Sequence, residues 1–502
     1  MVEAQINVAL SEQIGTVDAK VYGHFIEHLG GVIYDGVWVG EDSKVPNIDG
    51  IRKDLVDHLR AIKAPLIRWP GGCFADRYHW QDGVGPRHLR PSRYGRWRDV
   101  AESNAFGTHE FIRLCQLTGM EPYIAANVGT GTAEEFQQWV EYCNAPAGST
   151  TLADLRRRNG AREPFNVRYW GVGNENWSCG GGFTPEDYCT EYRRFTTWPP
   201  AFGLDLFFIA CGPAGNDLDW TGRFFKKYAG YRYGRTPLHG WAPHYYCGTA
   251  GNAVEYTDDQ WYELLHKGAF MEALIREQWD ALGEFDPKRN VKLVVDEWGT
   301  WHPSGTELNP SHLFEQACTL RDALVAALTL DIFNRHCEKV AMANIAQLVN
   351  CLQSLFLADG ARFVATPNYH VYDLYKSHQN AMGVRATFEA PEVEFKVGSS
   401  GEKRKLFGLA GSASVKDGML TLTVVNPHVE EPAEATITVL GGETLEGRGV
   451  VLTHKDIHAQ NTFENPKEVT PQRTDCAARG STFTHSFPPA SVTRLDLSLK
   501  RD

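Results

Sequence analysis

The sequence predicts an α/β protein in which a (β/α)8 TIM barrel carries a C-terminal antiparallel, jelly-roll-like β-sandwich. From about residue 18 to residue 376, short apolar runs typical of buried strands alternate about eight times with amphipathic helical runs. No Gly-rich dinucleotide fingerprint follows the first strand, which favours a closed barrel over an open doubly wound sheet. After about residue 380 the helical period gives way to short alternating strands separated by Gly, Pro and Asn.

The eight predicted barrel strands are rich in β-branched and aromatic residues, as strands buried on both faces are. They occupy residues 19–27, 64–72, 122–131, 167–175, 205–213, 238–246, 291–299 and 340–350. Between them, the run 51–62 places apolar residues at helical spacing. Thr132 with Glu135 predicts a capping box, and Thr184 before Pro185 predicts another helix start.

The remaining strands belong to the two ends of the chain. Alternating apolar residues predict C-terminal strands at 419–427, 434–440, 449–454 and 491–499, and the run 4–10 is also strand-like. We therefore expect residues 1–17 to add a strand to the sandwich, residues 18–379 to form the barrel, and residues 380–502 to form the sandwich.

Charge and cysteine usage restrict the class of protein. Lys and Arg number 50 against 62 Asp and Glu, a net charge of −12, and there is no basic cluster that would follow a phosphate backbone. The N-terminus lacks a signal-peptide pattern, and no apolar run reaches the roughly 18 residues of a membrane span. Eleven cysteines without a C-x-x-C pair favour reduced thiols over disulfides. We expect a cytoplasmic protein with neither nucleic acid nor membrane as a partner.

Two glutamates end barrel strands. Glu175 closes the fourth run and Glu297 closes the seventh, and these strands lie nearly opposite each other in an eight-stranded barrel. The active site of such a barrel lies at the carboxyl ends of its strands. Two carboxylates across a cleft are what glycoside hydrolysis requires, one as acid and one as nucleophile or base. The alternative is that each glutamate only caps a helix or pairs with an arginine.

Other strand ends supply groups that suit a sugar. Arg68 could hold a carboxylate ionised, Tyr246 could donate to the nucleophile, and His244 could bond a hydroxyl group. Aromatic rings at the barrel mouth could cover the apolar face of a sugar, and the candidates are Trp97, Trp177, Trp298 and Trp301. Of these we expect Trp298, next to Glu297, to contact substrate.

One motif points to a different chemistry. Residues 24–28, "HFIEH", match H-x-x-E-H, a zinc-peptidase signature whose histidines converge only on a helix. Glycines flank the motif, and on a strand the two histidines would lie about 13 Å apart. We therefore expect no metal here and interpret Glu27 as a ligand for a substrate hydroxyl.

At these residues the sequence resembles glycoside hydrolase family 51, the α-L-arabinofuranosidases, over essentially the whole chain. The matching stretches are "GHFIEHLGG", "RWPGGCFADRYHWQDGVGP", "GVGNEN", "VDEWG" and "ANIAQLVN". The resemblance implies that Glu175 is the general acid/base and Glu297 the nucleophile of a retaining mechanism. It also implies that furanose hydroxyls bind at Glu27, Asn174, Tyr246 and Gln347, with Cys73 at a position where some relatives have Asn.

The implied enzyme is exo-acting and needs no cofactor. It releases terminal non-reducing α-L-arabinofuranosyl residues from arabino- and arabinoxylo-oligosaccharides, and family members are commonly homo-hexamers. A β-xylosidase or endo-glucanase on the same machinery, and a non-catalytic carbohydrate-binding protein, are the alternatives. The loop 176–182 is expected to shape the side of the pocket beyond the cleaved bond, and the linkage preference stays open.

Overall fold

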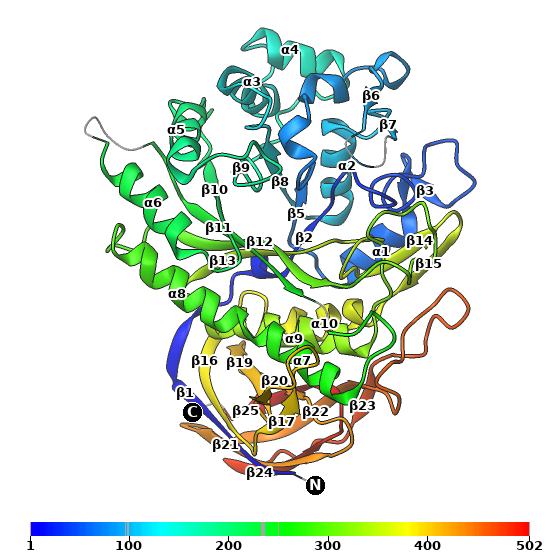
Figure 1. The fold of residues 1–502 in the computed structure, drawn as a ribbon, viewed down its shortest axis with the longest axis vertical. Helices are drawn as coiled ribbons and strands as arrows, with labels where there is room; N and C mark the ends of the chain where they lie inside the picture. Colours follow the sequence, from blue (N-terminus) through cyan, green and yellow to red (C-terminus); the bar gives the residue numbers. More distant parts are fainter. Residues whose placement is uncertain (1, 96, 98–99, 232–235, 249, 501–502) are drawn as a thin grey trace.

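The computed structural model describes the 502-residue chain except residues 1, 96, 98–99, 232–235, 249 and 501–502. A closed parallel barrel lies above a large, mostly antiparallel sheet, with α9 and α10 between them (Figure 1). This confirms the predicted TIM barrel with a C-terminal antiparallel sheet domain. In the described residues, no helix is both long enough and apolar enough to cross a bilayer.

The barrel closes in the order β10-β11-β12-β13-β2-β5-β8-β9, and each of the eight strands overlaps one predicted run. The first predicted run begins as a 3-10 turn, because the side chain of Asp18 accepts the N–H of Lys20. The barrel strands are β2 (Gly23–Phe25), β5 (Leu66–Trp69), β8 (Glu121–Ala126), β9 (Tyr169–Val172), β10 (Phe207–Ala214), β11 (Gly240–Gly248), β12 (Lys292–Trp301) and β13 (Val340–Ile345).

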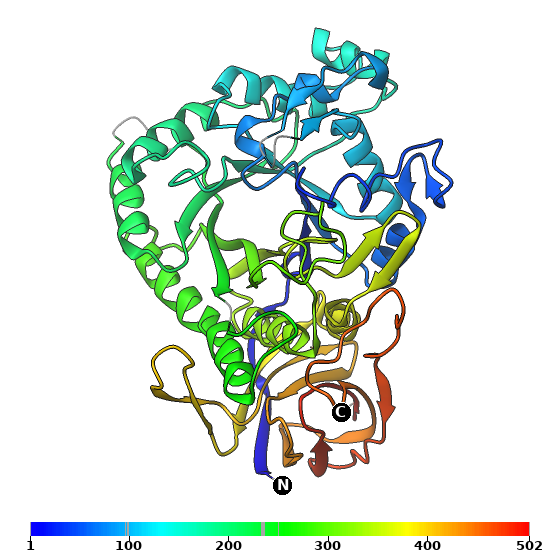
Figure 2. The same cartoon turned by 45° about the vertical axis from the view of Figure 1, so that its right-hand side comes forward.

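Helices surround the barrel (Figure 2). Thr132 and Thr184 cap α3 and α5 as predicted, but the Glu135 side chain contacts His79 instead of completing a capping box. The helices are α1 (Lys53–Ala61), α2 (Thr108–Thr118), α3 (Ala133–Asn144), α4 (Thr151–Arg158), α5 (Pro185–Thr196), α6 (Leu218–Ala229), α7 (Asp258–Ala269), α8 (Met271–Gly283), α9 (Leu320–Arg335) and α10 (Pro367–Tyr375), with 3-10 turns η1 (Ala19–Tyr22), η2 (Ala75–Arg77), η3 (Trp80–Gly83), η4 (Arg87–Leu89) and η5 (Lys376–His378).

Helix α9 joins the two parts of the molecule. All of its residues except Arg335 are buried, as expected for a helix enclosed on every side. It packs against β12 of the barrel and against β19 and β20 of the sheet. Its Asp331 accepts hydrogen bonds from Ser412 and Thr423, so a buried polar contact fixes the sheet on the barrel.

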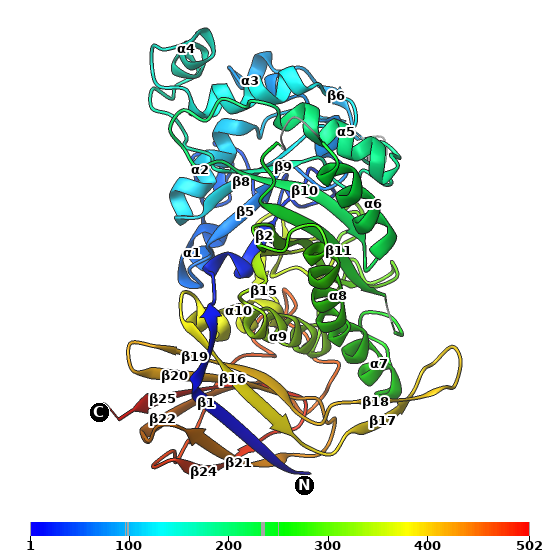
Figure 3. The ribbon, with the colours of Figure 1, turned by 90° about the vertical axis from the view of Figure 1, so that its left-hand side faces the viewer.

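The large sheet contains both ends of the chain. Strand β1 lies antiparallel to β16 and parallel to β21, and it runs along the sheet beside β16 in Figure 3. The order is β23-β22-β25-β20-β19-β16-β1-β21-β24. The strands are β1 (Val2–Thr16), β16 (Met382–Glu389), β19 (Ala410–Lys416), β20 (Met419–Asn426), β21 (Ala433–Leu440), β22 (Thr444–Thr453), β23 (Gln472–Thr474), β24 (Thr482–Phe487) and β25 (Ser491–Leu499).

Among the described residues, four short hairpins lie outside the barrel and the large sheet. The β17–β18 hairpin projects from the side of the molecule (Figures 2 and 3), with Phe395 anchored against α7. The hairpin strands are β3 (Asn47–Ile48) with β4 (Ile51–Arg52), β6 (Arg93–Tyr94) with β7 (Ala101–Glu102), β14 (Phe356–Asp359) with β15 (Arg362–Ala365), and β17 (Val393–Lys396) with β18 (Lys403–Leu406).

Candidate active site

Two carboxylates and one imidazole meet at the mouth of the barrel. Glu175 follows β9, His244 lies on β11, and Glu297 lies on β12, paired in register with His244. One oxygen of each carboxylate and a ring nitrogen of His244 all lie within 4.8 Å of one another. His244 Nδ1 is 3.1 Å from Glu175 Oε1 and 3.6 Å from Glu297 Oε2. The fold therefore brings the two predicted catalytic glutamates to one site.

Glu297 is held in its ionised form. Arg68 Nη1 donates to its Oε1 over 2.8 Å, and the Tyr246 hydroxyl donates to its Oε2 over 2.8 Å. Burial alone would raise the pKa of Glu297, but His244, Arg68 and Tyr246 together keep that pKa below its ordinary value. A buried, ionised carboxylate with two donors is suited to act as a nucleophile.

Arg68 connects two of the predicted groups, Glu297 and Asn174, and also lies near Asp296. Its Nη2 donates to Asn174 Oδ1 over 2.7 Å, and its Nε lies 3.7 Å from Asp296 Oδ2. The side chain is buried, with the guanidinium 4.7 Å from the centre of the Phe25 ring. Arg68 therefore orients both the carboxylate of Glu297 and the amide of Asn174, next to Glu175.

His244 links the two glutamates. Burial would lower the pKa of His244, but the neighbouring carboxylates of Glu297 and Glu175 together raise it. The sequence predicted that His244 would bond a substrate hydroxyl. In the structure β11 sets the ring between the two carboxylates, with Nδ1 in contact with Glu175, and the contact with a substrate hydroxyl stays a prediction.

The backbone that carries Glu175 is fixed by Asp76. Glu175 has a φ of 42°, in the left-handed region that is costly for a non-glycine residue. Asp76 Oδ2 accepts the N–H of Asn174 over 2.9 Å, and Asp76 Oδ1 accepts those of Val128 and Gly129. Burial raises the pKa of Asp76 to about 7. No periodic signal marks Asp76 as a site residue, because it lies on a 3-10 turn beyond the strand end, although it belongs to the matching stretch "RWPGGCFADRYHWQDGVGP".

Glu27 and Gln347 contact each other just past the ends of β2 and β13. Glu27 Oε1 accepts the N–H of Phe74 over 2.8 Å, and Glu27 Oε2 accepts Gln347 Nε2 over 3.2 Å. Burial and the charge of Glu297 raise the pKa of Glu27 to about 8. A side chain at position 72 would place its Cβ 2.3 Å from Glu27 Oε2, so only Gly72 fits beside this carboxyl.

Most of the predicted site residues line a single pocket. Arg68 and His244 are not among its lining residues, but Arg68 contacts Glu297 and His244 contacts both glutamates. Trp301, at the end of β12, also lines this pocket, as do Trp97 and Phe314 from loops. The predicted residues that line it are Glu27, Cys73, Asn174, Glu175, Tyr246, Glu297 and Gln347.

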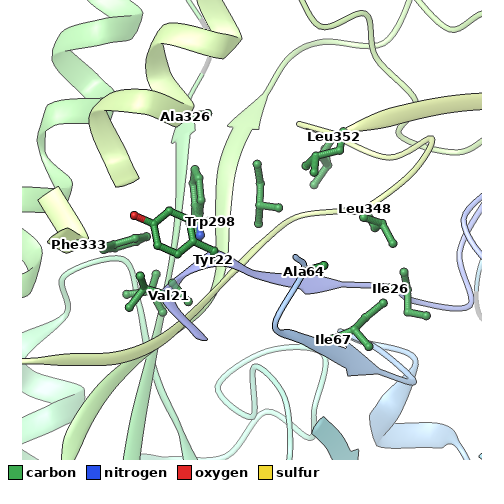
Figure 4. Close-up of a cluster of buried hydrophobic side chains, with 14 of the residues drawn as sticks. Val21, Tyr22, Ile26, Ala64, Ile67, Trp298, Ala326, Phe333, Leu348 and Leu352 are labelled. Atoms are coloured by element: carbon green, nitrogen blue, oxygen red, sulfur yellow. The ribbon is translucent and has the colours of Figure 1, made fainter. Parts of the chain in front are cut away.

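The prediction that Trp298 contacts substrate is wrong. Trp298 is 1% exposed, and its ring packs edge-on against Phe333 of α9. Figure 4 shows it among the buried apolar side chains around Tyr22 and Val21. Side chains alternate along a strand, so Glu297 points into the pocket and Trp298 points outward to the helices. Trp177 also lies away from the pocket-lining residues, with its Nε1 bonded to the carbonyl of Gly212.

The residues of the H-x-x-E-H motif do not converge. His24 is buried against the ring of Tyr372, and His28 bonds Glu102 and Trp69. Glu27 faces the pocket instead. Along the extended chain these side chains point to different surroundings, so the spacing required for a zinc-peptidase site is not met.

The expectation that all cysteines are reduced is wrong. A disulfide joins Cys73, after β5, to Cys179, after β9, across 106 residues of sequence. No local cysteine motif could indicate this pair, because only barrel closure brings the two strand ends together. The other cysteines of the described chain are free.

Comparison with known proteins agrees with this geometry. Family models described as "Alpha-L-arabinofuranosidase 1 domain" and "Alpha-L-arabinofuranosidase C-terminal domain" match residues 58–220 and 296–491. An intracellular exo-α-L-arabinofuranosidase of Bacteroides ovatus is 37% identical, over 98% of this chain and 95% of that protein. α-L-Arabinofuranosidase C of Emericella nidulans is 30% identical, over 98% and 96%.

Solved structures show the same relationship. The GH51 arabinofuranosidase of Xanthomonas axonopodis pv. citri superposes with a TM-score of 0.92 at 38% identity, covering 99% of this chain and 100% of that one. An arabinose complex of α-L-arabinofuranosidase from Thermotoga maritima gives a TM-score of 0.83 at 30% identity, covering 98% and 99%. The chain therefore belongs to glycoside hydrolase family 51, the α-L-arabinofuranosidases.

Proposed function

We propose that this protein is a retaining, exo-acting α-L-arabinofuranosidase that releases terminal non-reducing arabinofuranosyl residues from arabino- and arabinoxylo-oligosaccharides. The approach of Glu175 and Glu297, with carboxylate oxygens within 4.8 Å, carries the proposal. Retaining glycosidases hold their carboxyl groups about 5–5.5 Å apart, whereas inverting enzymes need about 6.5–9.5 Å to admit a water molecule. The short separation favours direct attack by one carboxylate.

In the first step, Glu297 attacks the anomeric carbon while Glu175 gives its proton to the departing glycosidic oxygen. The sugar–oxygen bond breaks as an ester bond to Glu297 forms. Arg68 and Tyr246 orient the attacking carboxylate. In the second step, Glu175 takes a proton from water, which displaces Glu297 and releases arabinose with its configuration retained.

The pocket walls suit the hydroxyl groups of a furanose. With a pKa of about 8, Glu27 carries a proton at neutral pH and can both donate to and accept from a hydroxyl. Asn174 and Gln347 present amide groups to the same pocket. We assign the loop after Glu175 to the side of the leaving group, because it continues directly from the acid/base.

The cellular setting is part of the proposal. The relative from Bacteroides ovatus is named intracellular, which supports a cytoplasmic enzyme acting on short imported oligosaccharides. We propose a homo-hexamer, as the family resemblance implies, and light scattering of the purified protein measures this directly. A monomeric mass at working concentration would contradict it.

Initial rates on three substrates test the function. 4-Nitrophenyl α-L-arabinofuranoside should be hydrolysed much faster than the β-D-xylopyranoside or a soluble β-glucan, with the Glu297→Gln variant as the inactive control. Proton NMR of the first-formed sugar should show the retained α anomer. Faster xyloside or glucan cleavage would favour the alternative specificities, and the absence of turnover would favour a carbohydrate-binding protein.

A further inference from the structure

We infer that the Cys73–Cys179 disulfide positions the acid/base Glu175, and that its reduction by a dithiol selectively slows the cleavage of glycosides with poor leaving groups. This inference rests on the proposed function. It gives a role to the one redox-active bond among the described residues, which lies in the catalytic pocket.

The disulfide joins the two loops that meet at the reacting bond. Cys73 lines the pocket and directly follows Gly72, the residue packed against Glu27. Cys179 lies in the loop that begins at Glu175. The loop that holds the arabinose and the loop that delivers the proton are therefore covalently connected across the pocket.

Cys179 lies against the acid/base itself. Its Sγ is 3.7 Å from Glu175 Oε2 and 3.8 Å from Asn174 Nδ2. A sulfur in a disulfide carries no proton, so the contact with Glu175 is a packing contact. The sulfur therefore packs against Oε2 of Glu175, whereas His244 bonds Oε1.

The backbone of this loop requires such support. Glu175 has a φ of 42°, and its carbonyl oxygen accepts the N–H groups of Ser178 and Gly180 in a tight turn. A Cβ at Gly180 would lie 2.0 Å from the Asn174 carbonyl oxygen, so the loop folds closely back on the strand end. A strained conformation persists only where its surroundings fix it, and the disulfide anchors this turn to the loop after β5.

Reduction changes both the restraint and the chemistry. A dithiol supplies two electrons and two protons: the bond between the sulfurs breaks, Cys73 and Cys179 each gain a proton, and the dithiol leaves as a cyclic disulfide. The new Cys179 thiol can donate to Glu175 Oε2 and so favour the ionised carboxylate. Both changes weaken proton donation, the step that limits cleavage of an unactivated glycoside.

Leaving-group dependence measures this effect. The oxidised and dithiothreitol-reduced forms of the full-length enzyme should be compared on methyl and 4-nitrophenyl α-L-arabinofuranoside, with the disulfide state determined by alkylation and mass spectrometry. On reduction, kcat/KM for the methyl glycoside should fall about 10- to 100-fold, the usual cost of a displaced catalytic group. The nitrophenyl rate should change little, because that leaving group departs without a proton.

Variants separate the disulfide from general effects of a thiol reagent. The Cys73→Ser/Cys179→Ser double variant should show the reduced pattern without reductant and should not respond to it. The Cys476→Ser variant, which alters a half-buried free thiol of the C-terminal domain, should behave as wild type. After reoxidation, the wild type should return to its original ratio of rates on the methyl and nitrophenyl glycosides.

Opposite outcomes overturn the inference. An unchanged ratio of rates with the bond shown to be reduced contradicts it, and so does an equal loss on both glycosides, including a loss that accompanies unfolding. Normal activity of the oxidised enzyme with either of these results leaves the proposed function intact. An oxidised enzyme that cleaves neither glycoside overturns the proposed function and the inference together.

Discussion

Arg68 Nη1 lies 2.8 Å from Glu297 Oε1, which ties the end of β5 to the end of β12 inside the barrel. The pair is buried, and Arg68 also contacts Asn174. A single guanidinium therefore links Glu297 to Asn174, the neighbour of Glu175, and its removal should be visible in the pH dependence of the reaction.

Replacing Arg68 by Met should move the acidic limb of the kcat/KM profile to higher pH. Arg68 helps to keep the pKa of Glu297 low, so its loss raises that pKa and leaves the nucleophile protonated over a wider acidic range. Thermal unfolding should also show a loss of about 3–5 kcal/mol, the usual cost of leaving buried charges unpaired. Arg68→Lys, which keeps the charge, should shift the limb less. An unmoved limb in the Met variant would contradict this role.

Glu175→Ala should separate substrates by leaving group. Glycosides that need protonation should lose about 10²–10⁴-fold in rate, the typical contribution of a general acid, while activated aryl glycosides should retain most of theirs in the first step. Steady-state rates on a series of aryl and alkyl arabinofuranosides measure how steeply the rate depends on the leaving group. An equal loss across the series would argue against the acid/base assignment.

Glu297→Ala should abolish turnover and respond to azide. The shortened side chain leaves room for a small anion to attack the anomeric carbon, so azide should restore activity on an aryl glycoside and give an arabinosyl azide of inverted configuration. NMR of the product identifies its configuration. Substantial activity of the variant without azide would rule out Glu297 as the nucleophile.

Glu27→Gln should change how stability depends on pH. The pKa of Glu27 is about 8 in the fold, compared with 4.5 for an ordinary glutamate. Between these values the folded enzyme retains a proton that the unfolded chain has lost, so this contribution to stability is complete below pH 4.5 and is lost as pH rises to about 8.

The amide does not titrate, so the variant should lose less stability than wild type between pH 5 and pH 8. The difference for one group is at most about 1.4 kcal/mol per pH unit. Denaturant unfolding at several pH values gives both curves, and Glu434→Gln, on the exposed surface of β21, is a control. Parallel curves for wild type and Glu27→Gln would contradict the raised pKa.

Two neighbouring tryptophans should have different roles. Trp298→Ala should cost about 3–5 kcal/mol of stability, because it empties a packed core site, with little effect on KM at a temperature where the variant is folded. Trp301 lines the pocket and is 39% exposed. Trp301→Ala should therefore raise KM and leave the unfolding midpoint nearly unchanged. A KM effect confined to Trp298→Ala would reverse this distinction.

The barrel was predictable because each of its strands carries its own signal. Buried parallel strands form continuous apolar runs, and the polar residues that end them mark the barrel mouth, so Glu175 and Glu297 could be recognised from sequence position. The directions of individual side chains were harder to predict. Trp298 and Glu297 are adjacent in sequence, but the pleat of β12 sends them to opposite faces.

Contacts made by loops could not be predicted. Asp76 and Cys179 both lie past the ends of strands, where spacing carries no periodic signal. Their partners are far away in the chain and come near only when the barrel closes. The one local clue was glycine: Gly72 and Gly180 stand where a side chain would collide with Glu27 and with the Asn174 carbonyl group.

Strand β1 pairs with β16 and β21, although hundreds of residues of barrel separate it from both. During synthesis β1 leaves the ribosome before the barrel segment, so it has no partner until that segment and β16 have followed it. Its apolar residues, including Ile6 and Val8, must stay exposed or protected by chaperones over that interval. Strands made after the barrel thus complete a sheet whose interior strand β1 was made before it, and this sheet cannot form until the segment from β16 to β25 has been translated.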